Sequence, residues 1–132
     1  MDILETLKQN EEFAKLLKET EAKSVENPVT KEVLQKYSEE IVKDYTLYSN
    51  EKSIAKGRVI YESGLIFFPY ENKKEHALVC LVSSKDGERL HVVKLVKSGG
   101  FLVPTCDCDI LAGHRYCKHV MAFLNYLWDI YK

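Results

Sequence analysis

Three cysteines and one histidine lie within fourteen residues near the C-terminus of this 132-residue chain. They form two tight pairs, Cys106-Asp107-Cys108 and Cys117-Lys118-His119, with eight residues between the pairs. Zinc in proteins prefers thiolate sulfur and imidazole nitrogen, and a closed set of four such ligands marks a structural rather than a catalytic site. The spacing therefore predicts one structural Zn²⁺ bound by Cys106, Cys108, Cys117 and His119.

Other uses of these residues remain open. His114 lies in the spacer and is a rival to His119, which is favoured because it stands at the expected start of a helix, where the dipole stabilises the Cys117 thiolate. The cysteines could instead form disulfides or be buried apolar residues. The N-terminus lacks the regions of a secretion signal, so we expect reduced thiols. Cys80 stands alone in an apolar run and is expected to be a small buried residue.

The order C-x-C, spacer, C-x-H resembles the signature of the SWIM zinc-finger domains. The Cys117-Lys118-His119 run and the apolar segment 120–131 after it strengthen the resemblance. Residues 77–79 and 90–93 look like the paired strands of that family. The resemblance thus covers roughly residues 58–132 and leaves residues 1–50 unexplained. It implies recognition of nucleic acid or protein, because SWIM domains occur in transposases, helicase-like ATPases, partners of recombinase paralogues and ubiquitin-linked signalling proteins.

The charge distribution is compatible with DNA binding by the C-terminal part. Residues 1–50 carry 11 acidic and 7 basic side chains, whereas residues 51–132 carry 9 acidic and 12 basic ones. A basic zinc-bearing part can contact DNA phosphates without reading sequence. We therefore predict a zinc module that binds DNA within a recombination or regulatory complex, although Asp107 and Asp109 would repel a phosphate. The basic residues expected to make these contacts are Arg89, Lys94, Lys97, Arg115 and Lys118.

The alternative function is that of a protein-interaction adaptor without nucleic-acid contact, in which the N-terminal helices bind a protein partner or a second copy of the chain. An enzyme is not expected, because four protein ligands leave zinc no open position. The sequence also lacks a histidine pair at i, i+4, a serine elbow and a glycine-rich phosphate loop. A Cys106–Cys108 dithiol switch that releases zinc on oxidation is a further possibility.

The elements that must position the zinc ligands divide the chain into two parts. In residues 1–50, apolar residues at three- to four-residue steps predict a helix that begins after Asp2 and ends at residues 26–28. Thr30 can cap a second helix. Together they predict a helical hairpin arm over residues 1–50. The apolar stripe of the second helix would consist of Leu34, Tyr37, Ile41, Tyr45 and Tyr48.

Residues 51–132 are expected to form the zinc-binding domain of an α+β fold. From Gly57 onward, the runs 58–61, 64–68, 77–82 and 90–96 are rich in β-branched and aromatic residues. Residues 85–87 can form a turn between the third and fourth runs, and Gly99-Gly100 can form a tight hairpin after the fourth, so we expect an antiparallel sheet. The helix 120–131 should cover this sheet with Val120, Met121, Leu124, Leu127, Trp128 and Tyr131, which we interpret as core residues.

The composition, with 45% hydrophobic and 30% charged residues, fits one small globular protein. No apolar run approaches the ~20 residues that a membrane helix needs. We therefore expect a soluble protein without a membrane partner, in the cytoplasm or, in a eukaryote, the nucleus.

Overall fold

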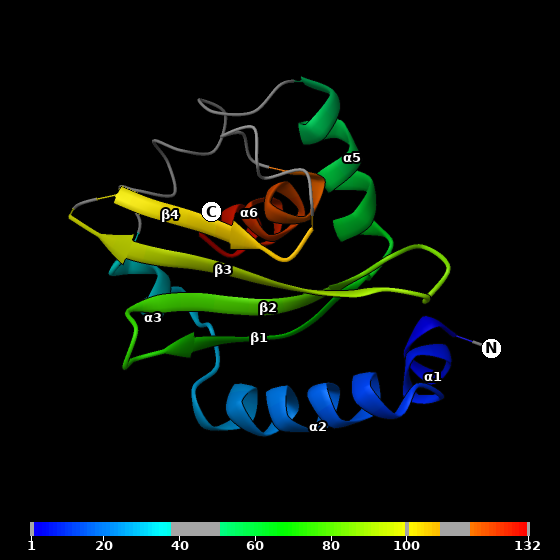
Figure 1. Cartoon of the computed structure of the whole chain (residues 1–132). Coiled ribbons are helices and arrows are strands. Elements are labelled where there is room, and N and C mark those ends of the chain that lie inside the picture. The colour runs from blue at the N-terminus through cyan, green and yellow to red at the C-terminus, as the bar shows by residue number, and fades with distance from the viewer. Residues whose placement is uncertain (1, 38–50, 100, 109–116, 132) are drawn as a thin grey trace.

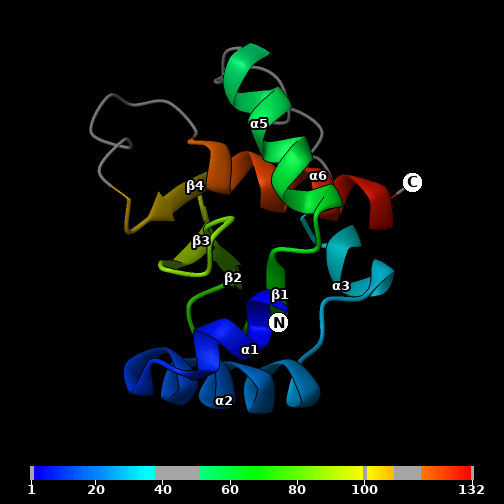
Figure 2. The same ribbon diagram turned by 90° about the vertical axis from the view of Figure 1, so that its right-hand side faces the viewer.

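The computed structural model describes residues 2–37, 51–99, 101–108 and 117–131. A four-stranded antiparallel sheet with the strand order β1-β2-β3-β4 forms its centre. Helices lie on both faces of this sheet, with α5 and α6 on one side and α1 and α2 on the other (Figures 1 and 2). The expected α+β class, with an antiparallel sheet and a C-terminal helix, is confirmed. The strands are β1 (Ile66–Asn72), β2 (Ala77–Ser83), β3 (Leu90–Ser98) and β4 (Phe101–Cys106).

Strand β2 is buried along its whole length, because helices cover both faces of the sheet there. Leu78, Cys80 and Val82 contribute to the core under α6, whereas Leu81 belongs to a second cluster with Leu7 of α1. A strand covered on both faces has a continuous apolar run rather than an alternating pattern. The run in residues 77–83 therefore already carried the signal of a central strand.

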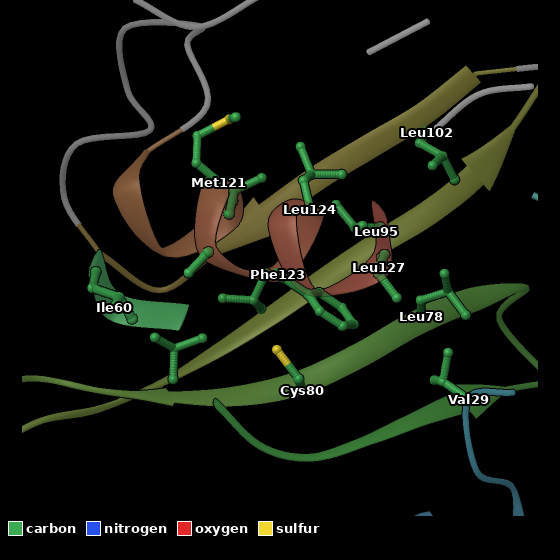
Figure 3. Close-up of a cluster of buried hydrophobic side chains, with 14 of the residues drawn as sticks. Val29, Ile60, Leu78, Cys80, Leu95, Leu102, Met121, Phe123, Leu124 and Leu127 are labelled. Carbon is green, nitrogen blue, oxygen red and sulfur yellow. The ribbon is translucent and has the colours of Figure 1, made fainter. Parts of the chain in front are cut away.

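The C-terminal helix α6 (Lys118–Tyr131) forms the main core with the sheet. Figure 3 shows Phe123, Leu124 and Leu127 of this helix beside Leu95 and Cys80 of the strands. The interpretation of the helix 120–131 as a core element is confirmed, since its apolar residues 120–124 and 127 are at most 1% exposed. Cys80 is fully buried as expected, and this burial raises the pKa of its thiol well above the ordinary value.

The first predicted helix is in fact two helices, α1 (Ile3–Lys8) and α2 (Glu11–Glu26). Asp2 caps α1 as expected, and Asn10 caps α2 by accepting from two backbone N–H groups. The prediction of one continuous helix is wrong, because the side chain of Asn10 satisfies the N–H groups of a new helix start. The predicted end before Pro28 is confirmed by the last residue of α2.

The described part of the N-terminal half packs on the sheet. Leu7 and Leu17 form a buried cluster with Leu81 and Leu90. The short helix α3 (Lys31–Gln35) is capped by Thr30 as expected. Its Leu34 and the following Tyr37 join the core beneath α6. The remaining stripe residues, Ile41, Tyr45 and Tyr48, lie outside the described residues.

Residues 58–61 are helical, so the expected first β run is wrong. They belong to α5 (Glu51–Glu62), which packs on α6. Gly57 is buried in this contact, where a methyl group would lie only 2.6 Å from the Cβ of Met121. Glycine thus permits a close approach of the two helices. The β propensity of residues 58–61 is weak in comparison with such tertiary packing.

Both expected turns adjoin the predicted strands. Gly87 has a φ of 74° in the turn between β2 and β3. Gly99 follows β3 with a φ of 57°, and Gly100 lies outside the described residues. Positive φ values are accessible to glycine at little cost, which explains both positions. Among the helices that the structure describes, none combines the length and apolarity needed to cross a membrane.

Candidate metal centre

The four predicted ligands converge where strand β4 ends and helix α6 begins. Cys106 is the last residue of β4 and pairs with Val93 of β3. Cys108 lies two residues further along the chain, and Cys117 immediately precedes α6. His119 lies in the first turn of that helix and is 5% exposed. The pair Cys106 and Cys108 thus lies at the end of β4, and the pair Cys117 and His119 lies at the start of α6.

The distances among the four ligand atoms fit a single metal ion. All four atoms lie within 4.8 Å of one another. The Nδ1 atom of His119 is 3.8 Å from Sγ of Cys106 and 3.8 Å from Sγ of Cys117. A tetrahedral zinc ion with bonds of ~2.3 Å to sulfur and ~2.0 Å to nitrogen requires sulfur–nitrogen separations of about 3.5 Å. Cys106, Cys108, Cys117 and His119 could thus hold a metal ion with small adjustments.

Hydrogen bonds prepare the thiols for this role. Hydrogen bonding between the two thiols lowers the pKa of Cys117 and raises that of Cys106. Backbone N–H groups also donate to these sulfurs, from Cys108 to Cys106 and from Val120 to Cys117. Metal ligation requires deprotonated thiols, and a bound ion would take the place of the shared proton. All four cysteines of the chain are free of disulfide bonds, so the disulfide alternative has no support in the structure.

His91 and Asp107 form a second layer beside the four ligands. The His91 ring packs on the His119 ring with 4.1 Å between the centroids and 32° between the planes. Its Nδ1 atom is 2.8 Å from Oδ1 of Asp107. Potential ligand atoms of His91, Cys106 and Asp107 also lie within 4.8 Å of one another. No local spacing in the sequence links His91 to the four candidate ligands, so the sequence motif does not reveal this position.

An open cleft of about 740 Å³ adjoins the metal centre. Helix α5 and the β2–β3 turn form part of its lining, together with His91, Asp107 and His119. Four cationic side chains line the cleft, and Asp107 is the only carboxylate among its described lining residues. The four cations are Lys56 of α5, Lys85 and Arg89 of the turn, and Lys118 of α6.

The structure brings together two of the five residues predicted to contact phosphate. Arg89 and Lys118 line the same cleft. Lys94 lies 3.4 Å from Glu75 and alternates along β3 with the residues that face α6. Lys97 donates to the carbonyl of Lys36 and lies over the Tyr37 ring, in a separate cavity lined by Lys36, Tyr37 and Glu71. Arg115 lies outside the described residues.

His76 does not belong to either group of potential metal ligands among the described residues. His76 is exposed in the turn between β1 and β2, with a φ of 52°. His114 and Asp109 lie outside the described residues. No sequence pattern marks Lys56 and Lys85 as neighbours of the site, because in the sequence each resembles an ordinary exposed lysine.

Comparisons with known proteins leave the chain without an assigned family. It matches no protein-family model, no curated protein and no solved structure. The donor group itself therefore carries the functional argument.

Proposed function

We propose that this chain is a SWIM-type zinc module, in which one structural Zn²⁺ bound by Cys106, Cys108, Cys117 and His119 joins the sheet to its covering helix. The observation that carries the proposal is the mutual closeness of these four donor atoms. Three sulfurs and one nitrogen suit zinc, and a closed set of four suits a structural ion. A small domain gains much of its stability from such an ion, since metal-binding free energy is folding free energy.

The function of the module is then non-enzymatic binding of nucleic-acid phosphates, as part of a DNA recombination or regulatory complex. Support comes from the position of Arg89 and Lys118, which line one cleft beside the metal centre. Contacts with phosphate provide affinity without sequence readout and depend strongly on salt. The Asp107 carboxylate, 2.8 Å from Nδ1 of His91, is one negative group in a described lining that carries four cations.

Fluorescence anisotropy with labelled DNA tests this function. The zinc-loaded protein is expected to bind two unrelated sequences equally and to lose affinity as salt rises. The double variant Arg89→Glu/Lys118→Glu should lose this binding, with unchanged zinc content and circular dichroism. A protein that is folded and zinc-loaded but does not bind DNA at low salt would refute the proposal. That outcome would favour a protein-interaction adaptor that binds a partner or a second copy through its N-terminal helices.

A further inference from the structure

We infer that the cleft beside the metal centre binds the phosphodiester backbone of single-stranded nucleic acid in preference to duplex DNA. This inference rests on the proposed function and specifies its ligand and its contact residues. The site is concave, and α5, the β2–β3 turn and α6 all contribute to its lining. The added contact residues are Lys56 and Lys85, which no sequence pattern had marked.

The first support is the convergence of charge. Lys56 is on α5, whereas Lys85 and Arg89 are on the β2–β3 turn, and Lys118 is at the start of α6. The salt bridges of the described residues involve other side chains, Arg58, Lys94 and His91, and none of these four cations. Four such charges around one concave space create a positive potential that attracts anions.

The nearest acidic groups do not neutralise this cluster. Oδ1 of Asp107 lies 2.8 Å from Nδ1 of His91, within hydrogen-bond distance. Asp86, in the same turn as Lys85, accepts from the Ser84 hydroxyl and from the backbone N–H of Glu88. These hydrogen bonds lower the pKa of Asp86. Hydrogen bonding does not remove the charge of Asp86, and Arg89 interacts with this carboxylate electrostatically. The four cations still outnumber the two carboxylates, so the cleft keeps an excess of positive charge.

The second support is the shape and size of the cleft. Its volume of about 740 Å³ lies within the range of roughly 300–1,000 Å³ that is typical of small-ligand sites. A space of this size takes one or two nucleotides. The phosphates of a duplex lie on a rigid convex cylinder and can reach only the cations at the rim of such a cleft, whereas a single strand bends and can enter it. Figure 1 shows α5 and the β2–β3 turn at the same end of the sheet.

The third support is the mixed character of the walls. Val59 of α5 is 46% exposed although it is a large apolar residue, and it lines the cleft with Ala55. The His91 ring also lines the cleft. Proteins that bind single strands without sequence preference combine a positive groove with aromatic side chains on which the bases stack. The described lining of the cleft supplies the positive charges and an apolar wall of Val59 and Ala55, and the His91 ring is already packed on His119.

Anisotropy titrations of the full-length zinc-loaded protein test the inference. The two labelled ligands are a single-stranded oligonucleotide and the duplex of the same sequence. Inorganic phosphate or a mononucleotide serves as the competitor. The single strand is expected to bind about tenfold tighter than the duplex. Four contacts predict a salt slope of about −2.8 for the single strand, and the variant Lys56→Glu/Lys85→Glu should reduce it to about −1.4 or less in magnitude. The matched control is Lys15→Glu/Lys18→Glu, two exposed lysines of α2.

Several outcomes would overturn the inference. Duplex that binds as tightly as the single strand would remove the preference but leave the proposed function intact. An unchanged single-strand affinity in a folded, zinc-loaded Lys56→Glu/Lys85→Glu variant would exclude the cleft. Displacement of the oligonucleotide by mononucleotide at similar concentrations would identify a small-anion site instead. Absence of binding to either form of DNA at low salt would refute both the inference and the proposed function.

Discussion

The Nδ1 atom of His91 lies 2.8 Å from Oδ1 of Asp107, although the two residues are sixteen positions apart in the chain. The pairing of β3 with β4 explains this closeness. Val93 is opposite Cys106, the last residue of β4, so that His91 lies beside the residues that follow Cys106. The His91 side chain is 12% exposed and also packs on His119. One histidine on a strand thus braces both halves of the metal centre.

Replacement of His91 by alanine should weaken zinc binding without changing its stoichiometry. The change removes the ring that packs on His119 and the hydrogen-bond partner of Asp107. Loss of a residue that orients a metal ligand typically costs about 10- to 100-fold in affinity. Competition with a chromophoric chelator measures the effect, and His76→Ala serves as the control because His76 is exposed and remote from the cluster. Equal affinities of the wild-type and His91→Ala proteins would count against this bracing role.

The purified protein should contain one zinc ion per chain. Replacement of Cys106, Cys108 or Cys117 by serine, or of His119 by alanine, should remove the ion. It should also lower the melting temperature by roughly 10 °C or more, because metal-binding free energy contributes to folding. Chelator treatment of the wild-type protein should have the same effect. Elemental analysis and thermal unfolding are the measurements.

Two variants control for this assignment of ligands. Cys80→Ala and His114→Ala should keep the zinc, since Cys80 is buried in the core and His119 already supplies the nitrogen. Zinc loss in His114→Ala together with zinc retention in His119→Ala would show that His114 is the fourth ligand.

Gly57→Ala should destabilise the protein, because the new methyl group would lie 2.6 Å from Cβ and 2.8 Å from backbone atoms of α6. Helix α5 would have to move away from Met121 and Ala122. Overpacking of this kind typically costs about 1–3 kcal/mol. Urea unfolding gives the free-energy change, and Lys52→Ala on the exposed side of α5 is the control. A Gly57→Ala variant as stable as this control would mean that the two helices separate easily.

Tyr37→Phe should lower stability near pH 8 and reduce its decline at alkaline pH. The Tyr37 hydroxyl donates to Oε2 of Glu71 at 3.0 Å, and Oε1 of this buried carboxylate has no partner among the described residues. A buried group left without its hydrogen bond costs about 1–3 kcal/mol. Burial, followed by the bond to Glu71, raises the pKa of Tyr37 above the ordinary value of 10.0.

The direction of the pH effect follows from this raised pKa. The folded protein holds the Tyr37 proton more tightly than the unfolded chain, so the stabilisation is complete below pH 10 and is lost as the pH rises toward the folded value. Denaturant unfolding at pH 8 and pH 11 measures the decline. An identical decline in the wild-type and Tyr37→Phe proteins would contradict the assignment of this titration to Tyr37.

Local sequence patterns predicted most strands and both ends of the sheet-covering helix. The apolar run of β2 and the turn residues before Gly87 are local features of the sequence. They can be recognised without knowledge of the fold. The same reasoning placed residues 58–61 in a strand, where contact with α6 selects a helix instead. The same reasoning overlooked the helix start at Asn10. The apolar residues keep their helical spacing on both sides of Asn10, so the break between the two helices is not visible in that spacing.

The four candidate metal donors are predictable from local sequence, because each pair lies on one short segment: Cys106 with Cys108, and Cys117 with His119. Their surroundings depend on tertiary packing. His91 reaches the centre through the register of β3 and β4, and Lys56 reaches the cleft because α5 packs on α6. Such neighbours depend on the packing of elements that are distant in sequence, and no local pattern records that packing.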